Sequence, residues 1–184
     1  MAEKLKRLKE SLEKSPVVKK GNYDYFVHPL TDGVPVIEPE LLEEVAQAIY
    51  DIIKRNKNEN IDKIVTIEAM GIPIGAALSL KTGIPFNIIR KKSYGLKREV
   101  SVQQVTGYSK SELYINGINK GDRVLLVDDV YSTGGTINSV VKALQEIGAE
   151  IVDTIVIVMK SDKKTDIKSL CNVDIVDGKV VVKE

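Results

Sequence analysis

Hydrophobic residues recur at helical spacing in two stretches near the start of the chain. Residues 3–14 place leucines among lysine and glutamate side chains, and a longer apolar face begins after Pro39 and continues to about Arg55. Between these stretches, residues 16–37 contain proline and glycine at short intervals, which predicts irregular structure with one or two short strands near Tyr23–Val27. We therefore expect two amphipathic helices separated by an irregular segment.

The middle and later parts of the chain alternate between continuous apolar runs and helical patterns. The apolar runs predict buried strands, and the helical patterns end at Gly83 and Gly148. In chain order the predicted elements are a strand at Ile64–Ile67, a helix at 72–82, a strand at Phe86–Arg90, a strand at Arg123–Val127, a helix at 135–147 and a strand at Glu150–Met159. Two strand–helix–strand units predict an α/β, doubly wound fold with a mainly parallel central sheet covered on both faces.

Residues 91–113 separate the two units. They are polar, basic at their start and interrupted by Gly95 and Gly107, which predicts a loop. A loop of this length inside a compact domain is unusual and is often functional, so we expect a mobile loop. Apolar runs around Asp177-Gly178 predict a hairpin near the end of the chain, and a length of 184 residues fits a single domain, 1–184.

Composition and charge exclude several classes of protein. Apolar residues make up 43% and charged residues 29%, and 27 basic against 26 acidic side chains leave a net charge of +1. Such a chain has no overall field that draws it to nucleic acid or to an anionic membrane, so we expect neither partner. The lone cysteine, Cys171, predicts no internal disulfide, and the charged start of the chain carries no signal peptide. We expect a cytoplasmic protein in which Cys171 is structural.

The stretch VLLVDDVYSTGGT, residues 124–136, carries the candidate chemistry. Gly134 and Gly135 allow the backbone to curl around a phosphate where a helix begins, and the free N–H groups of a helix N-terminus bind anions. The hydroxyls of Ser132, Thr133 and Thr136 add further donors. The pattern lacks the lysine of a phosphate-binding P-loop and the G-x-G-x-x-G of a dinucleotide fold, so it predicts a site for a phosphate monoester.

Asp128 and Asp129 stand beside this predicted anion site. Carboxylates accept hydrogen bonds from a vicinal diol, as the ribose-binding acids of nucleotide folds do. The pair would therefore hold the 2- and 3-hydroxyls of a ribose whose 5-phosphate lies in the turn. A Mg²⁺ ion between those hydroxyls and a diphosphate would also favour nearby negative charge, without a direct protein site of its own. The predicted ligand is a 5-phosphorylated ribose with a leaving group at C1.

Val124–Thr136 closely resembles the 5-phosphoribosyl-1-diphosphate (PRPP) motif of type I phosphoribosyltransferases. The stretch EAMGIPIG, 68–75, resembles the family's diphosphate loop, and FNIIRKK, 86–92, resembles the strand and basic start of its mobile hood loop. The resemblance covers roughly 60–160 and is closest to purine enzymes of the adenine and archaeal hypoxanthine/guanine type. One alternative to this resemblance stays open. In it, residues 124–136 are only an acidic strand end followed by a glycine turn that caps a helix.

The resemblance implies a reaction in which a purine base and PRPP give a nucleoside 5-monophosphate and diphosphate, with Mg²⁺. The task is then to stabilise a departing diphosphate and to exclude water. Ala69, Met70 and Gly71 would offer backbone N–H groups to the diphosphate. Adenine-type relatives often carry arginine at the position of Met70, so the cationic side chains that begin the loop would supply more of the charge. These are Arg90, Lys91 and Lys92, whose alternative role is that of solvated surface cations.

The loop 91–113 would close over the site and keep water away. Its candidates for ligand contact are Tyr94, Lys97, Arg98 and Tyr108. A general base is not defined, because some 6-oxopurine enzymes place an acid where this chain has Ser132. Glu99 and Glu112 stay open as loop candidates, as does the absence of any dedicated base.

Base recognition is expected from three regions. Lys160 ends a predicted strand, and the resemblance implies a hydrogen bond from such a lysine to the purine O6, which favours hypoxanthine or guanine. Tyr131 either stacks on the purine or packs in the core. Tyr25 and Phe26 would line the pocket from a small N-terminal hood formed by residues 1–37. His28 is expected to be structural or solvated.

Several functions remain open alongside hypoxanthine/guanine salvage. Adenine, xanthine and orotate are alternative bases, and a PRPP- or purine-sensing transcription regulator is an alternative class. Residues 1–37 are too short and too proline-interrupted for a winged helix. A PRPP synthase homologue would need a longer chain with an ATP site. The resemblance also implies a homodimer with a partner loop near the diphosphate site.

Overall fold

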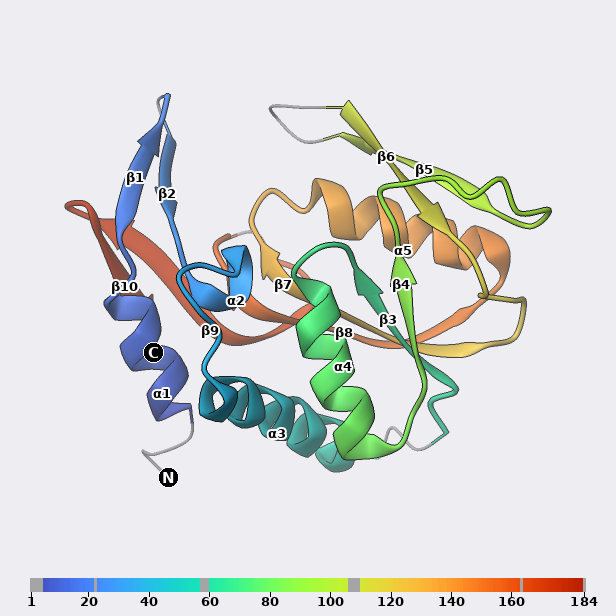
Figure 1. Ribbon diagram of the computed structural model, residues 1–184, viewed down its shortest axis with the longest axis horizontal. Coiled ribbons are helices and arrows are strands. Elements are labelled where there is room, and N and C mark those ends of the chain that lie inside the picture. The colour runs from blue at the N-terminus through green and yellow to red at the C-terminus, as the bar shows by residue number, and fades with distance from the viewer. Residues whose placement is uncertain (1–4, 22, 57–59, 106–109, 163, 184) are drawn as a thin grey trace.

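The computed structural model describes residues 5–21, 23–56, 60–105, 110–162 and 164–183. Its centre is a sheet of six strands in the order β10-β9-β8-β7-β3-β4 (Figure 1). The strands are β3 (Lys63–Ile67), β4 (Phe86–Ile89), β7 (Arg123–Tyr131), β8 (Glu150–Met159), β9 (Lys168–Val176) and β10 (Lys179–Lys183). All neighbours pair in parallel except β9 and β10, which form the predicted terminal hairpin. The predicted α/β fold with a mainly parallel sheet is confirmed.

Helices cover both faces of this sheet, as predicted. They are α1 (Lys6–Glu13), α2 (Pro29–Asp32), α3 (Pro39–Arg55), α4 (Gly71–Thr82) and α5 (Gly135–Ile147). One core cluster joins α1, α3 and α4 to the sheet, and a second joins α5 to the opposite face. Figure 1 shows α3 and α4 crossing below the sheet, with α5 on its other side. The predicted helix boundaries hold where local signals define them: Pro39 occupies the first turn of α3, and Gly83 ends α4 in a left-handed conformation.

Strand β7 extends further than the apolar pattern indicates. We expected it to end at Val127 with the two aspartates in a turn, but the strand continues to Tyr131. The reason is tertiary, because β8 pairs with β7 as far as the Tyr131–Met159 pair and supports the polar residues in the ladder. Asp128 and Asp129 therefore lie on a strand and not in a turn.

The expected loop at 91–113 contains much of a hairpin. Strands β5 (Val100–Val105) and β6 (Lys110–Ile115) pair antiparallel and lie beside α5 (Figure 1). Val102, Leu113 and Ile115 bury one face of the hairpin, which explains why a largely polar segment is ordered. The predicted mobility of the segment stays a prediction. Tyr108, a candidate for ligand contact, lies outside the described residues.

The N-terminal segment carries its own small hairpin. Strands β1 (Val17–Lys20) and β2 (Tyr23–Phe26) pair antiparallel and rise at the left of Figure 1. His28 is fully buried, with its ring bonded to the Ser11 hydroxyl and to the Leu30 amide, and burial lowers its pKa to about 4. His28 thus has the structural role that was one of its two expected roles, and Cys171 is likewise buried. Within the described residues, no helix has the length and apolar character needed to cross a membrane.

Candidate active site at the ends of strands β3 and β7

The sheet order places a topological switch point between β3 and β7. From β3 the chain crosses through α4 to β4 on one side, whereas from β7 it crosses through α5 to β8 on the other. Ligands of open α/β sheets bind in the crevice outside the carboxyl ends of strands at such a point. The segments that follow β3 and β7 are Glu68–Gly71 and Ser132–Thr136, which are the predicted diphosphate loop and phosphate turn.

The phosphate turn has the geometry that an anion requires. Gly134 has φ +84°, and a Cβ at this position would lie 2.3 Å from the Tyr131 hydroxyl oxygen, so only glycine fits. Helix α5 begins at Gly135 and has no side-chain cap, which leaves its first N–H groups directed at the crevice. Ser132 is half-buried and Thr133 is exposed at the same turn. The turn therefore offers backbone and hydroxyl donors to one phosphoryl group.

The two aspartates are held in an environment that disfavours their charge. Asp128 is 7% exposed, and burial and then the charge of Asp129 raise its pKa well above the usual range. Burial also raises the pKa of Asp129 to about 6. Hydroxyl donors or a cation stabilise the charged form of carboxylates in such a site. The pair can therefore accept hydrogen bonds from a ribose diol.

The predicted diphosphate loop lies against this pair. A Cβ on Gly71 would be 3.1 Å from Asp128 Oδ1, which shows how closely the loop approaches the acid. Ala69 is exposed and the Glu68–Ala69 peptide bond is cis. Met70 is half-buried, and its sulfur lies 3.6 Å from the position of a Cβ on Gly33 at the end of α2. The backbone of the loop at Gly71 therefore approaches Asp128, and the Met70 side chain lies beside Gly33.

The basic residues after β4 are attached to the same loop. Arg90 Nε donates to Glu68 Oε2 over 2.7 Å, and the Lys91 amide donates to the same oxygen over 2.9 Å. The Lys91 amide and then Arg90 hold the pKa of Glu68 below its usual value. The charge of Lys91 partly opposes the rise in the pKa of Asp128, which places this exposed cation within electrostatic reach of that acid. Arg90 and Lys91 are therefore close to the predicted site, and sequence reasoning missed the carboxylate that holds them.

Lys160 lies where the carboxyl end of β8 meets the N-terminal hairpin. Its ammonium group donates to the Tyr23 hydroxyl and to the Asp24 carbonyl, each over 2.7 Å. The Lys160 amide donates to the Tyr131 carbonyl over 2.8 Å, which ties the residue to the strand that carries the acids. Lys160 is thus a fixed cation beside the phosphate turn. Sequence reasoning did not identify Tyr23 as its partner.

The three aromatic candidates for base contact differ in their placement. Tyr131 and Phe26 are each 5% exposed and belong to the two core clusters. The Tyr131 hydroxyl lies beside Gly134 of the phosphate turn, and its contact with a purine stays a prediction. Phe26 packs in the core in this conformation. Tyr25 is half-buried and its hydroxyl donates to Asp32 over 2.5 Å, with burial as the main cause of its raised pKa.

Asp32 is a third carboxylate near the acid pair, and the sequence analysis did not identify it. It accepts hydrogen bonds from Tyr25, from the His28 amide and from the Thr31 hydroxyl. Its charge contributes to the raised pKa of Asp129. The local signal was only the Pro29 that opens a one-turn helix, and nothing in the sequence linked that helix to β7.

The two loop glutamates considered as general bases have other partners. Glu99 accepts from Ser93, from the amides of Tyr94 and Gly95, and from Asn116, and these bonds, led by Ser93, lower its pKa to about 2. Glu112 accepts from the Tyr114 hydroxyl over 2.5 Å. A carboxylate with the pKa of Glu99 is a weak base, so its contacts organise the turn before β5. Lys97 and Arg98 are exposed in that turn.

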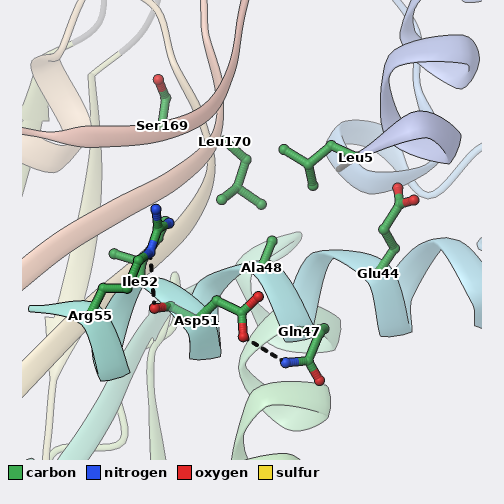
Figure 2. Close-up of a pocket in the computed structure, with 9 residues that line it drawn as sticks. All are labelled: Leu5, Glu44, Gln47, Ala48, Asp51, Ile52, Arg55, Ser169 and Leu170. Carbon is green, nitrogen blue, oxygen red and sulfur yellow. Dashed lines mark hydrogen bonds between the residues drawn. The ribbon is translucent and has the colours of Figure 1, made fainter. Parts of the chain in front are cut away.

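A separate hollow of about 300 Å³ lies between α1, α3 and β9 (Figure 2). Leu5, Ala48, Ile52 and Leu170 form its apolar floor, and polar side chains of α3 surround it (Figure 2). None of its lining residues belongs to the crevice at the switch point. No group of three or more His, Cys, Asp or Glu side chains in the described part of the chain could hold a metal ion.

The fold and the site define a class of protein. Residues 36–182 match the phosphoribosyl transferase domain family, and the chain belongs to this family. The match includes the phosphate turn, the acid pair and the diphosphate loop, which are the parts that the sequence analysis had recognised. The N-terminal hairpin that carries Tyr23 and Tyr25 lies outside it.

Close relatives narrow the class further. The chain is 56% identical to a hypoxanthine/guanine phosphoribosyltransferase of Methanobacterium paludis, over 96% of this chain and 95% of the relative. It is 54% identical to the enzyme of the same name from Methanocaldococcus infernus, over 96% of this chain and the whole of the relative. These alignments include the N-terminal segment as well as the domain.

Solved structures bear out the fold. An adenine phosphoribosyltransferase of Thermoanaerobacter pseudethanolicus superposes with a TM-score of 0.74 over 91% of this chain and 99% of that one, at 24% identity. The adenine phosphoribosyltransferase of Saccharomyces cerevisiae superposes with a TM-score of 0.75 over 92% and 98%, at 22% identity. At this identity the similarity concerns the fold and not the choice of base.

Proposed function

We propose that the chain transfers the 5-phosphoribosyl group of PRPP to hypoxanthine or guanine and releases IMP or GMP with diphosphate. The observation that carries this proposal is the joint placement of the acid pair, the uncapped phosphate turn and Lys160 at the switch point. The names of relatives at 53–57% identity support the choice of a 6-oxopurine. The adenine alternative has support only from similarity of fold.

The phosphate turn and the acid pair bind different parts of the ribose 5-phosphate. The amides at the start of α5 and the nearby hydroxyls hold the 5-phosphate, and Asp128 and Asp129 accept from the ribose hydroxyls. Both segments belong to one stretch, β7 and the turn that follows it, so their separation is fixed by a buried strand. A rigid scaffold of this kind positions C1 of the sugar without a large ordering cost.

The diphosphate leaves toward the loop after β3. The exposed backbone at Ala69 and the nearby charges of Arg90 and Lys91 stabilise the developing negative charge. Glu68 holds Arg90 and the Lys91 amide in place, so these groups need little reorganisation when the substrate binds. The hairpin β5–β6 excludes water from the activated ribose when it closes.

Mg²⁺ is the proposed cofactor, and the buried acid pair fits a nearby cation. Burial raises the pKa values of Asp128 and Asp129, so a cation beside them would stabilise the charged form of the pair. The ion would have no direct protein site, and oxygens of the diphosphate, of the ribose hydroxyls and of water would be its ligands. When bound, Mg²⁺ would neutralise charge on the diphosphate.

Recognition of the base rests on Lys160. An ammonium group donates hydrogen bonds and accepts none, so it pairs with the O6 acceptor of hypoxanthine or guanine and not with the 6-amino donor of adenine. A site built to hydrogen-bond one of these groups rejects the other strongly, because a buried polar group is otherwise left unpaired.

The test is an ultraviolet assay with PRPP, Mg²⁺ and each of hypoxanthine, guanine, xanthine and adenine. Turnover of hypoxanthine and guanine with at least a hundredfold lower kcat/KM for adenine is the expected result. Turnover of adenine alone would contradict the base assignment, and no PRPP-dependent turnover with any base would contradict the proposed reaction. A gel shift with DNA then tests the regulator alternative.

We also propose that the chain forms a homodimer through the outward face of α4. This helix is apolar on nearly all sides, and Leu80 on its surface is 90% exposed. A helix that is apolar all round is ordinarily buried, and a second copy of the chain would cover this face.

Sedimentation velocity tests the dimer. Leu80→Lys should shift the chain from dimer to monomer at micromolar concentration, whereas Val181→Lys, at an exposed valine of β10, should leave the dimer intact. A wild-type monomer, or a dimer that Leu80→Lys does not weaken, would contradict this interface. The cytoplasmic location stays a prediction, which cell fractionation would test.

A further inference from the structure

We propose that Tyr23 is a positioning residue that links the base end of the site to its phosphate end. Its hydroxyl lies between the Lys160 ammonium, at 2.7 Å, and the Ser132 hydroxyl, at 3.3 Å. Lys160 follows β8 and Ser132 begins the phosphate turn, so one side chain of the N-terminal hairpin contacts both ends of the crevice. The inference rests on the function proposed above, and it adds a residue that the matched domain does not include.

Lys160 is oriented by two acceptors of the same hairpin. Its ammonium nitrogen donates to the Tyr23 hydroxyl and to the Asp24 carbonyl, and it lies 4.0 Å from the centre of the Tyr23 ring. An ammonium group has three N–H donors, so one remains for a ligand once these two are made. With two hydrogen bonds and a cation–π contact to fix the other directions, that third donor has a defined aim.

The chemistry of the donors gives the contact a direction. A lysine ammonium cannot accept a hydrogen bond, so the Tyr23 oxygen must accept from Lys160. The proton of Tyr23 is then directed away from Lys160, and the Ser132 oxygen, at 3.3 Å, accepts it in the order of donation that we propose. Ser132 in turn keeps its own proton for the anion in the phosphate turn. In the proposed order Lys160 donates to Tyr23, Tyr23 donates to Ser132, and Ser132 donates to the phosphoryl group.

This chain of hydrogen bonds couples two parts of the ligand that do not touch each other. Linked hydrogen bonds polarise one another, so a phosphoryl group that accepts from Ser132 strengthens the donation from Tyr23. At the other end, the purine O6 would accept from the remaining N–H of Lys160, whose direction is set by the bonds to Tyr23 and Asp24. The structure thus assigns to Tyr23 a part in 6-oxopurine choice that depends on its hydroxyl and not only on its ring.

Tyr23→Phe tests the proposal, since it keeps the ring and removes the hydroxyl. The expected result is a rise of about tenfold in KM for hypoxanthine and guanine, with kcat changed less than threefold. The Kd of ribose 5-phosphate, measured by calorimetry, should rise by about threefold because Ser132 loses its partner. Tyr50→Phe in α3, which removes a tyrosine hydroxyl away from the crevice, should leave all three quantities unchanged.

A double-mutant cycle separates positioning from a structural role. With Lys160→Met as the second change, Tyr23→Phe should cause no further rise in KM for hypoxanthine, because the lysine it positions is gone. Ser132→Ala should remove the effect of Tyr23→Phe on ribose 5-phosphate in the same way. Full additivity in both cycles, or wild-type KM values in Tyr23→Phe, would overturn the inference. Thermal melts of each variant check that the fold is kept.

The outcomes also distinguish this inference from the proposed function. Wild-type protein that turns over neither hypoxanthine nor guanine would contradict the proposed function and, with it, the role of Tyr23 in base choice. Wild-type protein that is active, with Tyr23→Phe indistinguishable from it, would overturn the inference alone. The calorimetric result with ribose 5-phosphate tests the link between Tyr23 and Ser132 whichever base is used.

Discussion

At the scale of single residues, the acid pair combines a cost in stability with a use in binding. Burial raises the pKa values of Asp128 and Asp129, so the charged pair destabilises the free protein. A ligand that donates hydroxyls or brings a cation relieves this cost. Sites at which local chemistry opposes stability in this way are characteristic of function.

Replacing both aspartates by asparagine should separate the two effects. We expect Asp128→Asn with Asp129→Asn to weaken ribose 5-phosphate binding by roughly a hundredfold or more, since several charge-assisted hydrogen bonds are lost. Unfolding by urea should show a variant that is more stable than wild type by roughly 1–2 kcal/mol at pH 8. Retained binding would contradict the assignment of these residues to the ribose.

The sign of the stability change follows from the raised pKa values. A carboxyl whose folded pKa exceeds its unfolded pKa destabilises the folded protein as the pH rises through that interval, here from about 4 to 6 and above. At pH 4 the folded pair is already protonated, so the variant and the wild type should differ little. A stability gain of equal size at pH 4 and pH 8 would show that the charge is not its cause.

Gly134 offers a second test at a single position. Gly134→Val adds a side chain at φ +84°, where its Cβ would lie 2.3 Å from the Tyr131 hydroxyl. The turn must shift, and a shift of about 1 Å in a positioning element commonly costs roughly a hundredfold in kcat/KM. Steady-state kinetics with PRPP would measure this loss. Gly178→Val, at a positive φ in the terminal hairpin with open space around it, is the matched control, and an equal loss there would contradict the local explanation.

At the scale of elements, the features that depend on local sequence could be predicted, whereas those that depend on long-range strand pairing could not. Helix starts and ends were predictable because Pro39, Gly83 and Gly148 act within one turn of chain. The extension of β7 was not, because the ladder that holds Asp128 and Asp129 comes from β8. The hairpin β5–β6 was read as a loop because only one of its faces is buried, by a few residues among polar ones.

In the candidate site, too, the contiguous residues could be predicted from the sequence and the long-range contacts could not. The phosphate turn and the acid pair are contiguous, and their chemistry could be read from thirteen residues. The partners that hold the site are distant: Tyr23 bonds Lys160 across 137 positions and Arg90 bonds Glu68 across 22. No periodicity or spacing marks such pairs, so they could be identified only once the fold was known.

The ion pair between Arg90 and Glu68 joins the end of β4 to the end of β3. Glu68→Gln should keep the length of the side chain but weaken its hold on Arg90 and on the Lys91 amide. Because these groups would then have to be ordered by the substrate, we expect KM for PRPP to rise by about three- to tenfold with a smaller change for the base. Glu43→Gln removes the exposed pair with Lys81 and is the control. Equal effects of the two variants would contradict a role for Glu68 in substrate binding.

At the scale of the whole molecule, the sheet order explains why the site lies where it does. Three segments far apart in sequence meet at the switch point: the loop after β3, the turn after β7 and the N-terminal hairpin beside β8. The first two lie within the matched domain, and the hairpin precedes it. The matched domain therefore contains the two segments predicted to bind PRPP, and the hairpin that precedes it contacts Lys160.

The pH dependence of activity should report the state of the acid pair. Protonated carboxyls donate where they should accept, so kcat/KM for PRPP should fall as the pH drops below about 6, the pKa of Asp129 in the free protein. Ionisation of the substrate contributes to the same region and the pKa of Asp128 is raised as well, so the profile is compared with that of the double variant Asp128→Asn with Asp129→Asn. An acid limb at the same pH in that variant would assign it to the substrate and contradict this account.

A crystal structure of the protein with GMP tests the central claim most directly. We expect the 5-phosphate in the turn at Ser132–Thr136, the ribose hydroxyls within hydrogen-bond distance of Asp128 and Asp129, and the purine O6 beside Lys160. A nucleotide bound elsewhere, or bound in this crevice with its phosphate away from the start of α5, would contradict the account.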